Sequence, residues 1–134
     1  MALTKDRDTH RREGVQNSDP VAAATRIFAG SLVCLNAAGF AVPGATATTL
    51  TARGRAEEQV DNRDGAAGDL KVETRRGVFR FDNSAAADEI TRADILSECY
   101  IVDDQTVAKT DGTSTRSVAG IIQDVDEAGV WVEI

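Results

Sequence analysis

The stretch Cys99-Tyr100-Ile101-Val102-Asp103-Asp104-Gln105-Thr106-Val107-Ala108 decides the fold class of this chain. Two short runs of β-branched and aromatic residues flank a polar, acidic turn, which is the pattern of a β-hairpin. The pattern returns further along, where Val118–Val125 and Val130–Ile134 flank the acidic turn Asp126–Gly129. Two consecutive hairpins predict an antiparallel sheet in this half of the chain.

The first half has short apolar runs of the same kind. Leu32–Leu35 and Phe40–Val42 flank Asn36–Gly39, a turn sequence, and therefore predict another hairpin. Ala45–Thr51 has no charge and no bulky core residue before Leu50, so we expect a strand or an extended connection there.

The middle of the chain adds two more strands. Leu70–Arg75 alternates, which places Leu70, Val72 and Thr74 on one face and the charges on the other. Gly77–Phe81 follows, with both phenylalanines on one face. A short helix is expected only within Ala85–Leu96, where Thr91 or Asp94 can cap a turn. The expected fold is mostly β: a small antiparallel barrel or sandwich of about eight short strands with at most one short helix.

Residues 1–19 have a different composition from the rest. No large apolar residue lies between Leu3 and Val15, and Gly14 interrupts any helix. The segment balances four basic residues against four acidic ones: Lys5, Arg7, Arg11, Arg12, Asp6, Asp8, Glu13 and Asp19. We expect an extended N-terminal arm over 1–19 and a β domain over 20–134 that begins at Pro20. A frayed tail without a function is the alternative.

The apolar content is thinner than it first looks. Of the 56 apolar residues among 134, 21 are alanine, and Leu, Ile, Val and Phe together number 30. That is about 22% of the chain, close to the roughly 20% below which highly charged chains are disordered. A domain of this kind gains stability by burying surface against a partner.

Several classes of function are not expected. No apolar run is long enough for a transmembrane helix, and the start of the chain has no apolar signal sequence, so we expect synthesis in the cytoplasm and no membrane. The net charge of −7 disfavours nucleic acid as a partner. Cys34 and Cys99 have no metal-ligand spacing and are interpreted as free, buried thiols.

No residue pattern indicates catalysis, a cofactor or a metal. The single histidine, His10, lies in the arm, which supplies no partner to orient it. Asp124–Gly129 superficially resembles the start of a calcium loop, but no glutamate occupies the last ligand position, and we interpret these acids as turn residues. Tyr100 and Trp131 are possible interface anchors, or they pack on the sheet.

The two halves of the chain share a pattern. The matched segments are Val33–Leu35 with Tyr100–Val102, Phe40–Val42 with Thr106–Ala108, Thr51–Gly54 with Ser117–Gly120, Val60-Asp61 with Val125-Asp126, and Val72-Glu73 with Val132-Glu133. Either a duplication or the shared composition of β-hairpins explains the match, and both explanations stay open at this point.

Taken together, several segments resemble a known family. They are Ala93-Asp94, Cys99–Ala108, Thr115–Gly120 and Gly129–Val132, and in the first half Ala29–Val33 and Gly77-Val78-Phe79. The chain looks like the capsid cement, or decoration, proteins of Mu-like and related tailed bacteriophages. The resemblance covers roughly residues 20–134 and consists of turn and strand motifs.

The resemblance implies a non-enzymatic virion protein that is made in the host cytoplasm and binds the capsid exterior. Its implied partners are the major capsid protein, whose neighbouring subunits it would bridge, and further copies of itself in a homotrimer. In the arm, we expect contacts to the capsid or to a neighbouring subunit from Leu3, Lys5, Arg7, Arg11 and Arg12.

Two other functions compete with this hypothesis. One is a tail-tube or connector protein, although no long alternating hairpin for subunit stacking stands out in the sequence. The other is a ligand-binding β-barrel that uses the acidic turns.

Overall fold

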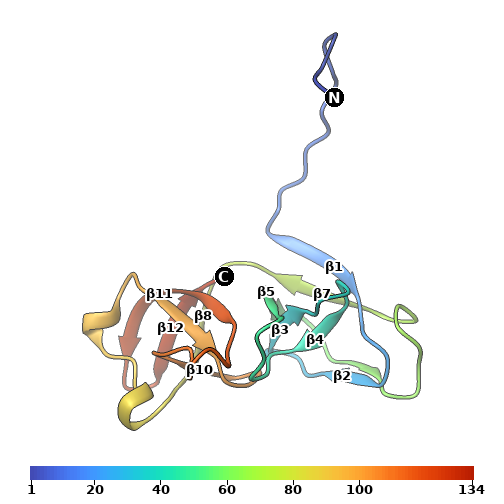
Figure 1. Ribbon diagram of the computed structural model, residues 1–134. Coiled ribbons are helices and arrows are strands. Elements are labelled where there is room, and N and C mark those ends of the chain that lie inside the picture. Colours follow the sequence, from blue (N-terminus) through green and yellow to red (C-terminus); the bar gives the residue numbers. More distant parts are fainter.

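The computed structural model describes all residues, 1–134, and contains twelve β-strands and two 3-10 turns (Figure 1). The strands are β1 (Gln16–Pro20), β2 (Thr25–Ile27), β3 (Leu32–Leu35), β4 (Ala41–Pro43), β5 (Thr51–Ala56), β6 (Val60–Asn62), β7 (Lys71–Arg75), β8 (Val78–Asn83), β9 (Glu98–Ile101), β10 (Thr106–Ala108), β11 (Val118–Asp126) and β12 (Gly129–Glu133). The mostly β fold with a small barrel is confirmed, with twelve strands in place of about eight.

The second half of the chain closes into a five-stranded barrel. Its strand order is β10-β8-β12-β11-β9, and only β10 and β8 pair in parallel. Both hairpins expected here are present, as β9–β10 and β11–β12. Strand alternation sends one face of each strand into the core, which includes Ile101, Ile122, Val130 and Val132.

The first half forms a five-stranded sheet with the order β1-β7-β5-β3-β4, flanked by the short pair β2–β6. The expected hairpin is present as β3–β4. A parallel bridge between Val21 and Ala41 brings the two outer strands of the sheet together. Val72 and Thr74 of β7 are buried as expected, but Leu70 precedes the strand and is 43% exposed.

The two halves have the same strand topology. Strands β1, β7, β5, β3 and β4 correspond in order to β8, β12, β11, β9 and β10. Each half also has a β-bulge at the same place. Gly54 lies opposite Val33, just past the irregularity in β3–β5, and Gly120 lies opposite Cys99, just past the irregularity in β9–β11. The internal repeat is therefore structural and not a coincidence of composition.

The strand registers correct part of the sequence match. They confirm Phe40–Val42 with Thr106–Ala108 and Thr51–Gly54 with Ser117–Gly120. They pair Val33–Leu35 with residues 99–101 instead of 100–102, and Val72-Glu73 with Val130-Trp131 instead of Val132-Glu133. Val60-Asp61 belongs to β6, which pairs with β2, whereas Val125-Asp126 pairs within β11–β12. The match was wrong there because the connection between β5 and β7 is longer and carries β6.

The two halves form one body because strand β3 contributes side chains to the hydrophobic cores of both. Leu32 and Cys34 of β3 belong to the cluster that fills the barrel, whereas Val33 between them belongs to the core of the first half. The uncharged connection after β4 crosses to the barrel. There Ala45 forms an antiparallel β-bridge with Asp103, and the Thr46 hydroxyl donates a hydrogen bond to the Val102 carbonyl at 2.9 Å. Of the expected strand or extended connection over Ala45–Thr51, residues 45–50 form a connection and Thr51 begins strand β5.

The N-terminal arm is shorter than the expected 1–19. Residues 16–20 form β1, which pairs with β7 along its whole length. The guanidinium of Arg53 also donates to the carboxylate of Asp19 at 2.7 Å. Backbone pairing and this ion pair hold a polar segment in the sheet, although its sequence has no apolar alternation to indicate a strand. The arm is therefore defined from here on as residues 1–14.

The helix expected within Ala85–Leu96 is replaced by two 3-10 turns, η1 (Ala86–Asp88) and η2 (Arg92–Asp94). The side-chain amide of Asn83 binds both the N–H and the carbonyl of Ile90, at 2.9 and 2.8 Å, and Ile90 enters the core. A helix cannot pass through a residue whose backbone groups are already bound. The capping role expected for Thr91 or Asp94 is present, because the two form a capping box.

The bulge glycines are expected to be essential to the fold. A methyl group at Gly54 would lie 2.5 Å from the carbonyl oxygen of Arg75, and one at Gly120 would overlap the carbonyl of Glu133. Gly54→Ala or Gly120→Ala should lower the free energy of unfolding by about 2–3 kcal/mol or more, measured by urea denaturation. Gly30→Ala is the control, since its methyl would meet nothing within 4 Å and only its positive φ adds strain. Equal losses at Gly30 and Gly54 would contradict the prediction.

Candidate interaction surface

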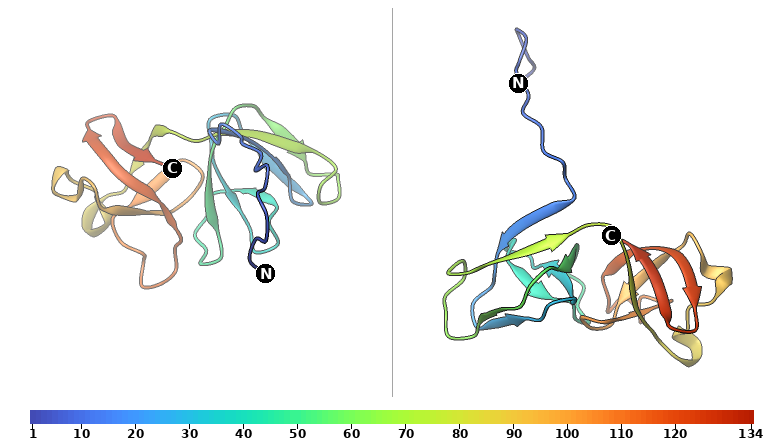
Figure 2. Two further views of the ribbon diagram at one scale, coloured as in Figure 1. Left: turned by 90° about the horizontal axis from the view of Figure 1, so that it is seen from above. Right: turned by 180° about the vertical axis from the view of Figure 1, so that it is seen from behind.

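The arm projects away from both halves of the molecule (Figures 1 and 2). No hydrogen bond or ion pair joins residues 1–14 to the rest of the chain, and the one ion pair within the arm, Arg11 with Glu13, spans 3.9 Å. Leu3, the only leucine in the arm, is 72% exposed. The structure thus places the five arm residues singled out from the sequence on one extended, solvent-exposed segment: Leu3, Lys5, Arg7, Arg11 and Arg12.

The arm leaves the body beside the end of β12. The N–H of Arg76 donates to the Val15 carbonyl at 2.7 Å, and the N–H of Ile134 donates to the Gly77 carbonyl at 2.9 Å. Since Arg76 and Gly77 are adjacent, these two bonds hold the root of the arm close to Ile134. Figures 1 and 2 show the arm rising from the side of the molecule on which residue 134 lies.

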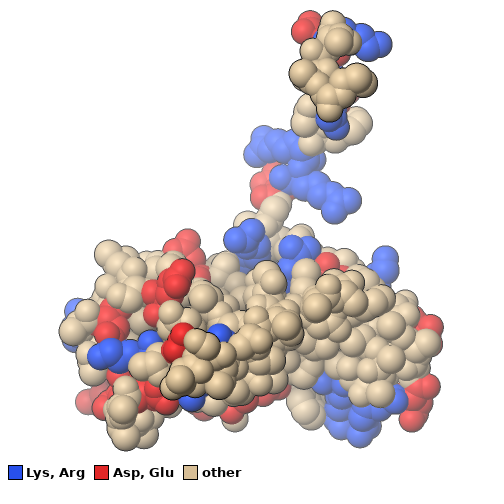
Figure 3. Space-filling model, viewed as in Figure 1, with Lys and Arg blue, Asp and Glu red and all other residues tan.

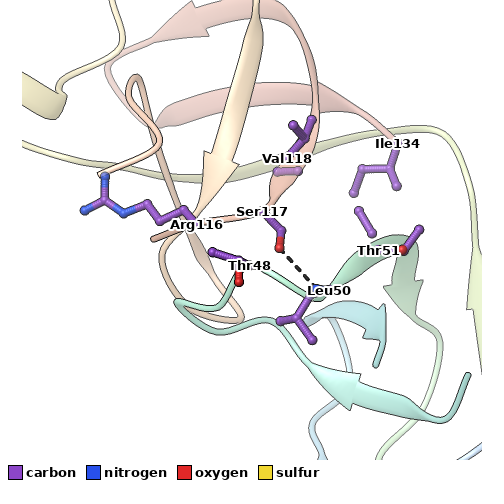
Figure 4. Close-up of a pocket in the computed structure, with 9 residues that line it drawn as sticks. Thr48, Leu50, Thr51, Arg116, Ser117, Val118 and Ile134 are labelled. Atoms are coloured by element: carbon purple, nitrogen blue, oxygen red, sulfur yellow. Dashed lines mark hydrogen bonds between the residues drawn. The ribbon is translucent and has the colours of Figure 1, made fainter. Parts of the chain in front are cut away.

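A groove of about 540 Å³ lies between the two halves on this side (Figure 4). Its apolar lining includes Leu50, Val118 and Ile134, and Arg116 lies at its rim. Ser117 joins its two sides, because its hydroxyl donates to the Ala47 carbonyl at 2.6 Å and accepts from the N–H of Leu50 at 3.1 Å. No pattern in the sequence pointed to these residues as a binding site; the one available signal was the repeat, which makes Thr51 equivalent to Ser117.

Two strand edges border the groove without a strand partner. β5 pairs with β3 from Thr51 onward, but β7 joins it only from Arg55. β11 pairs with β9 from Val118 onward, but β12 joins it only from Ile121. Open edges of this kind can accept an additional extended segment through backbone hydrogen bonds.

Charge is distributed unevenly along the chain. Residues 77–134 contain four basic and twelve acidic groups, a net charge of −8, whereas residues 16–76 contain seven of each. The arm contains four basic and three acidic groups, a net charge of +1. Figure 3 shows acidic side chains over the second half and basic ones along the arm. The negative charge of the barrel therefore favours basic partners, and the arm is the one of these three segments with a net positive charge.

The two candidate anchor residues both lie on the outside of the barrel. Trp131 alternates with the buried Val130 and Val132, and its indole N–H donates to the Asp126 carboxylate at 2.8 Å. Tyr100 alternates with the buried Cys99 and Ile101 and lies directly opposite Val118 of β11. Both rings are half-buried, and only Tyr100 pairs with a residue that lines the groove.

No group of side chains in the structure has the arrangement of a metal site. No three His, Cys, Asp or Glu side chains lie together in an arrangement that could hold a metal ion. Burial raises the pKa of Cys34 and of Cys99 to about 12, which keeps both as thiols at neutral pH. Asp126 is bound within its own turn, where it accepts hydrogen bonds from the N–H groups of Ala128 and Gly129.

Comparisons of the chain with protein families, with curated proteins and with solved structures find no match. Neither of the two 3-10 turns is long or apolar enough to cross a membrane.

The bond between Trp131 and Asp126 makes a measurable pH prediction. The indole N–H, followed by backbone N–H groups, lowers the pKa of Asp126 below its ordinary value of 3.8. The stabilisation is therefore complete above that ordinary value and is lost as the pH falls through the lowered pKa. Fluorescence of Trp131, the only tryptophan, should change in that acid range while the fold persists. Asp126→Asn should abolish the change and Asp111→Asn should retain it; a transition that persists in Asp126→Asn would assign it to another group.

Proposed function

We propose that this protein is a structural, non-enzymatic component of a tailed-phage virion. It binds the outer surface of the assembled capsid as a homotrimer and stabilises the shell by bridging neighbouring subunits of the major capsid protein. The resemblance of residues 20–134 to capsid decoration proteins suggests this role. The features described below support it.

The observation that carries the proposal is the free, charged arm. Fourteen residues extend from a well-packed β body without touching it. Such a segment becomes ordered when it meets a partner, and its basic side chains can then pair with acidic groups of a shell. The body itself has paired strands and a continuous core, so it can act as a rigid spacer between the arm and the opposite face.

Binding of this kind stabilises a shell by mass action. A protein that binds only the assembled shell adds its binding free energy to that of assembly. Because a shell offers many equivalent sites, even weak individual contacts sum to a large effect. A thin core is compatible with such a role, since only 26 of 134 residues are buried within the single chain.

The tail-tube alternative has less support. The longest strand, β11 (Val118–Asp126), is paired with β9 and β12 inside the barrel and does not project as a stacking hairpin. The alternative of a ligand-binding barrel also has less support, because it relies on the acidic turns. Carboxylates there already have partners within the chain: Asp126 accepts a hydrogen bond from the N–H of Ala128, and Asp124 pairs with Arg92.

Removing residues 2–14 should abolish or strongly weaken binding to the shell and leave the body folded. The deletion stops before β1, so the strand pairing with β7 is retained. The measurement is co-sedimentation with shells assembled from the major capsid protein of the same phage, together with the thermal midpoint of the free protein. Undiminished binding by a deletion variant with an unchanged thermal midpoint would remove the arm from the proposed function.

Charge reversal tests the chemistry of the same contact. The triple variant Arg7→Glu, Arg11→Glu, Arg12→Glu should bind shells at least about tenfold more weakly if the arm pairs with acidic shell groups. The matched control reverses three basic residues of the body, Arg26, Arg63 and Lys71, which lie outside the arm. Equal weakening by both triple variants would indicate a general effect of net charge and contradict a specific role of the arm.

A further inference from the structure

The structural repeat identifies an outer face of the barrel that lacks a cover. In the first half, Cys34 and Ala52 lie opposite each other on β3 and β5, and both pack against the barrel core. The registers make Tyr100 and Val118 the equivalent pair on β9 and β11. Tyr100 is half-buried and Val118 is 40% exposed. The face is therefore more exposed on the barrel, because Cys34 is fully buried and Ala52 half-buried at the groove, whereas Tyr100 is half-buried and Val118 exposed.

This open face continues into the groove between the halves. Val118 and Ile134 line the groove together with Leu50, and the unpaired edges of β5 and β11 border it (Figure 4). The groove is within the size range of binding pockets, about 300–1,000 Å³. An extended segment carrying one large apolar side chain fits this combination of apolar lining and open strand edges.

We propose that the groove binds the arm of a second copy of this chain, with Leu3 entering between Leu50, Val118 and Ile134. The arm is extended, has no partner in its own chain, and carries Leu3 on a segment, Ala2–Thr4, that has no charge. It is rooted at the rim of the groove through the bonds at Val15 and Ile134. A copy that meets its neighbour on this side would therefore bring its arm to the neighbour's groove.

Charge complementarity favours the same occupant. The charged part of the arm begins with Lys5 and Arg7, immediately after the uncharged segment. On the barrel, Glu98 and Glu133 flank Ile121 on the neighbouring strands, and both glutamates are exposed. An arm with a net charge of +1 thus approaches a barrel with a net charge of −8.

The length of the arm permits the exchange. The twelve residue steps from Val15 to Leu3 span at most about 40–43 Å, at 3.3–3.6 Å for each residue. This allows Leu3 to reach a neighbouring molecule and leaves Arg11 and Arg12 between that contact and the root of the arm. Repeated head to tail around an axis, the contact closes a ring of identical copies. This contact would join the copies of the proposed homotrimer, so it deepens the proposed function, and it does not require a shell.

Disulfide trapping between two variants tests the contact in solution. A Leu3→Cys variant is mixed with a Val118→Cys variant under mild oxidation, and a disulfide-linked heterodimer should form. The native cysteines do not compete, because both are buried thiols. The matched control replaces Val118→Cys by Leu96→Cys, at another exposed apolar residue on the barrel, and should give at least about tenfold less heterodimer. Equal yields with both partners would overturn the proposal.

Sedimentation equilibrium provides an independent measurement without added cysteines. The full-length protein should self-associate. Leu3→Asp should weaken association about tenfold or more, since a carboxylate would replace the apolar side chain that the groove of the second copy buries. Leu3→Asp lies outside the folded body and leaves its stability unchanged, whereas Leu96→Asp serves as the surface control. Exchange between copies would be refuted if the full-length protein stays monomeric. It would also be refuted if the double variant Leu3→Cys/Val118→Cys forms its disulfide only within one chain. Neither experiment involves a shell, so this result and that of the shell-binding experiment are independent.

Discussion

The burial of strand β3 on both faces is the constraint on which the rest of the structure depends. Val33 packs into the core of the first half, while Leu32 and Cys34 on its opposite face complete the core of the barrel. A strand in that position must be apolar at every residue, and Leu32–Leu35 is the one uninterrupted run of large apolar side chains in the first half. Two small cores of 11 and 7 buried residues become one body because they meet on the same strand.

This shared strand explains how a chain with few large apolar residues folds. Each half has only about 60 residues, a size at which a domain buries about 60% of the surface that its unfolded chain exposes and is only marginally stable. One strand thus supplies side chains to both cores. The connection at residues 44–50 strengthens the junction through Ser117, whose hydroxyl binds backbone groups on the far side of the groove. The remaining apolar surface, around Val118 and in the arm, is where a partner can add stability.

The repeat shows how one fold serves two purposes. Both halves turn the same corner, where a bulge and a glycine let β5 approach β7 and let β11 approach β12 too closely for any side chain. They differ on the outer face next to that corner. There the first half has Cys34 and Ala52, which are small enough to pack against the barrel of the second half. The second half has Tyr100 and Val118, which are more exposed. Equivalent positions thus pack internally in the first half and stay more exposed in the second.

Local features were predictable from the sequence because they depend on neighbouring residues. Alternation and turn residues predicted the hairpins β3–β4, β9–β10 and β11–β12, and the charge density of the first residues predicted an arm. The end of that arm, the register of the repeat, the replacement of the helix at Ile90 and the groove at Val118 depend on backbone pairing between residues far apart in the chain. The sequence by itself thus determined the class of fold and the arm. Only the tertiary structure decided which face stays open, because the exposure of a strand depends on what packs against it.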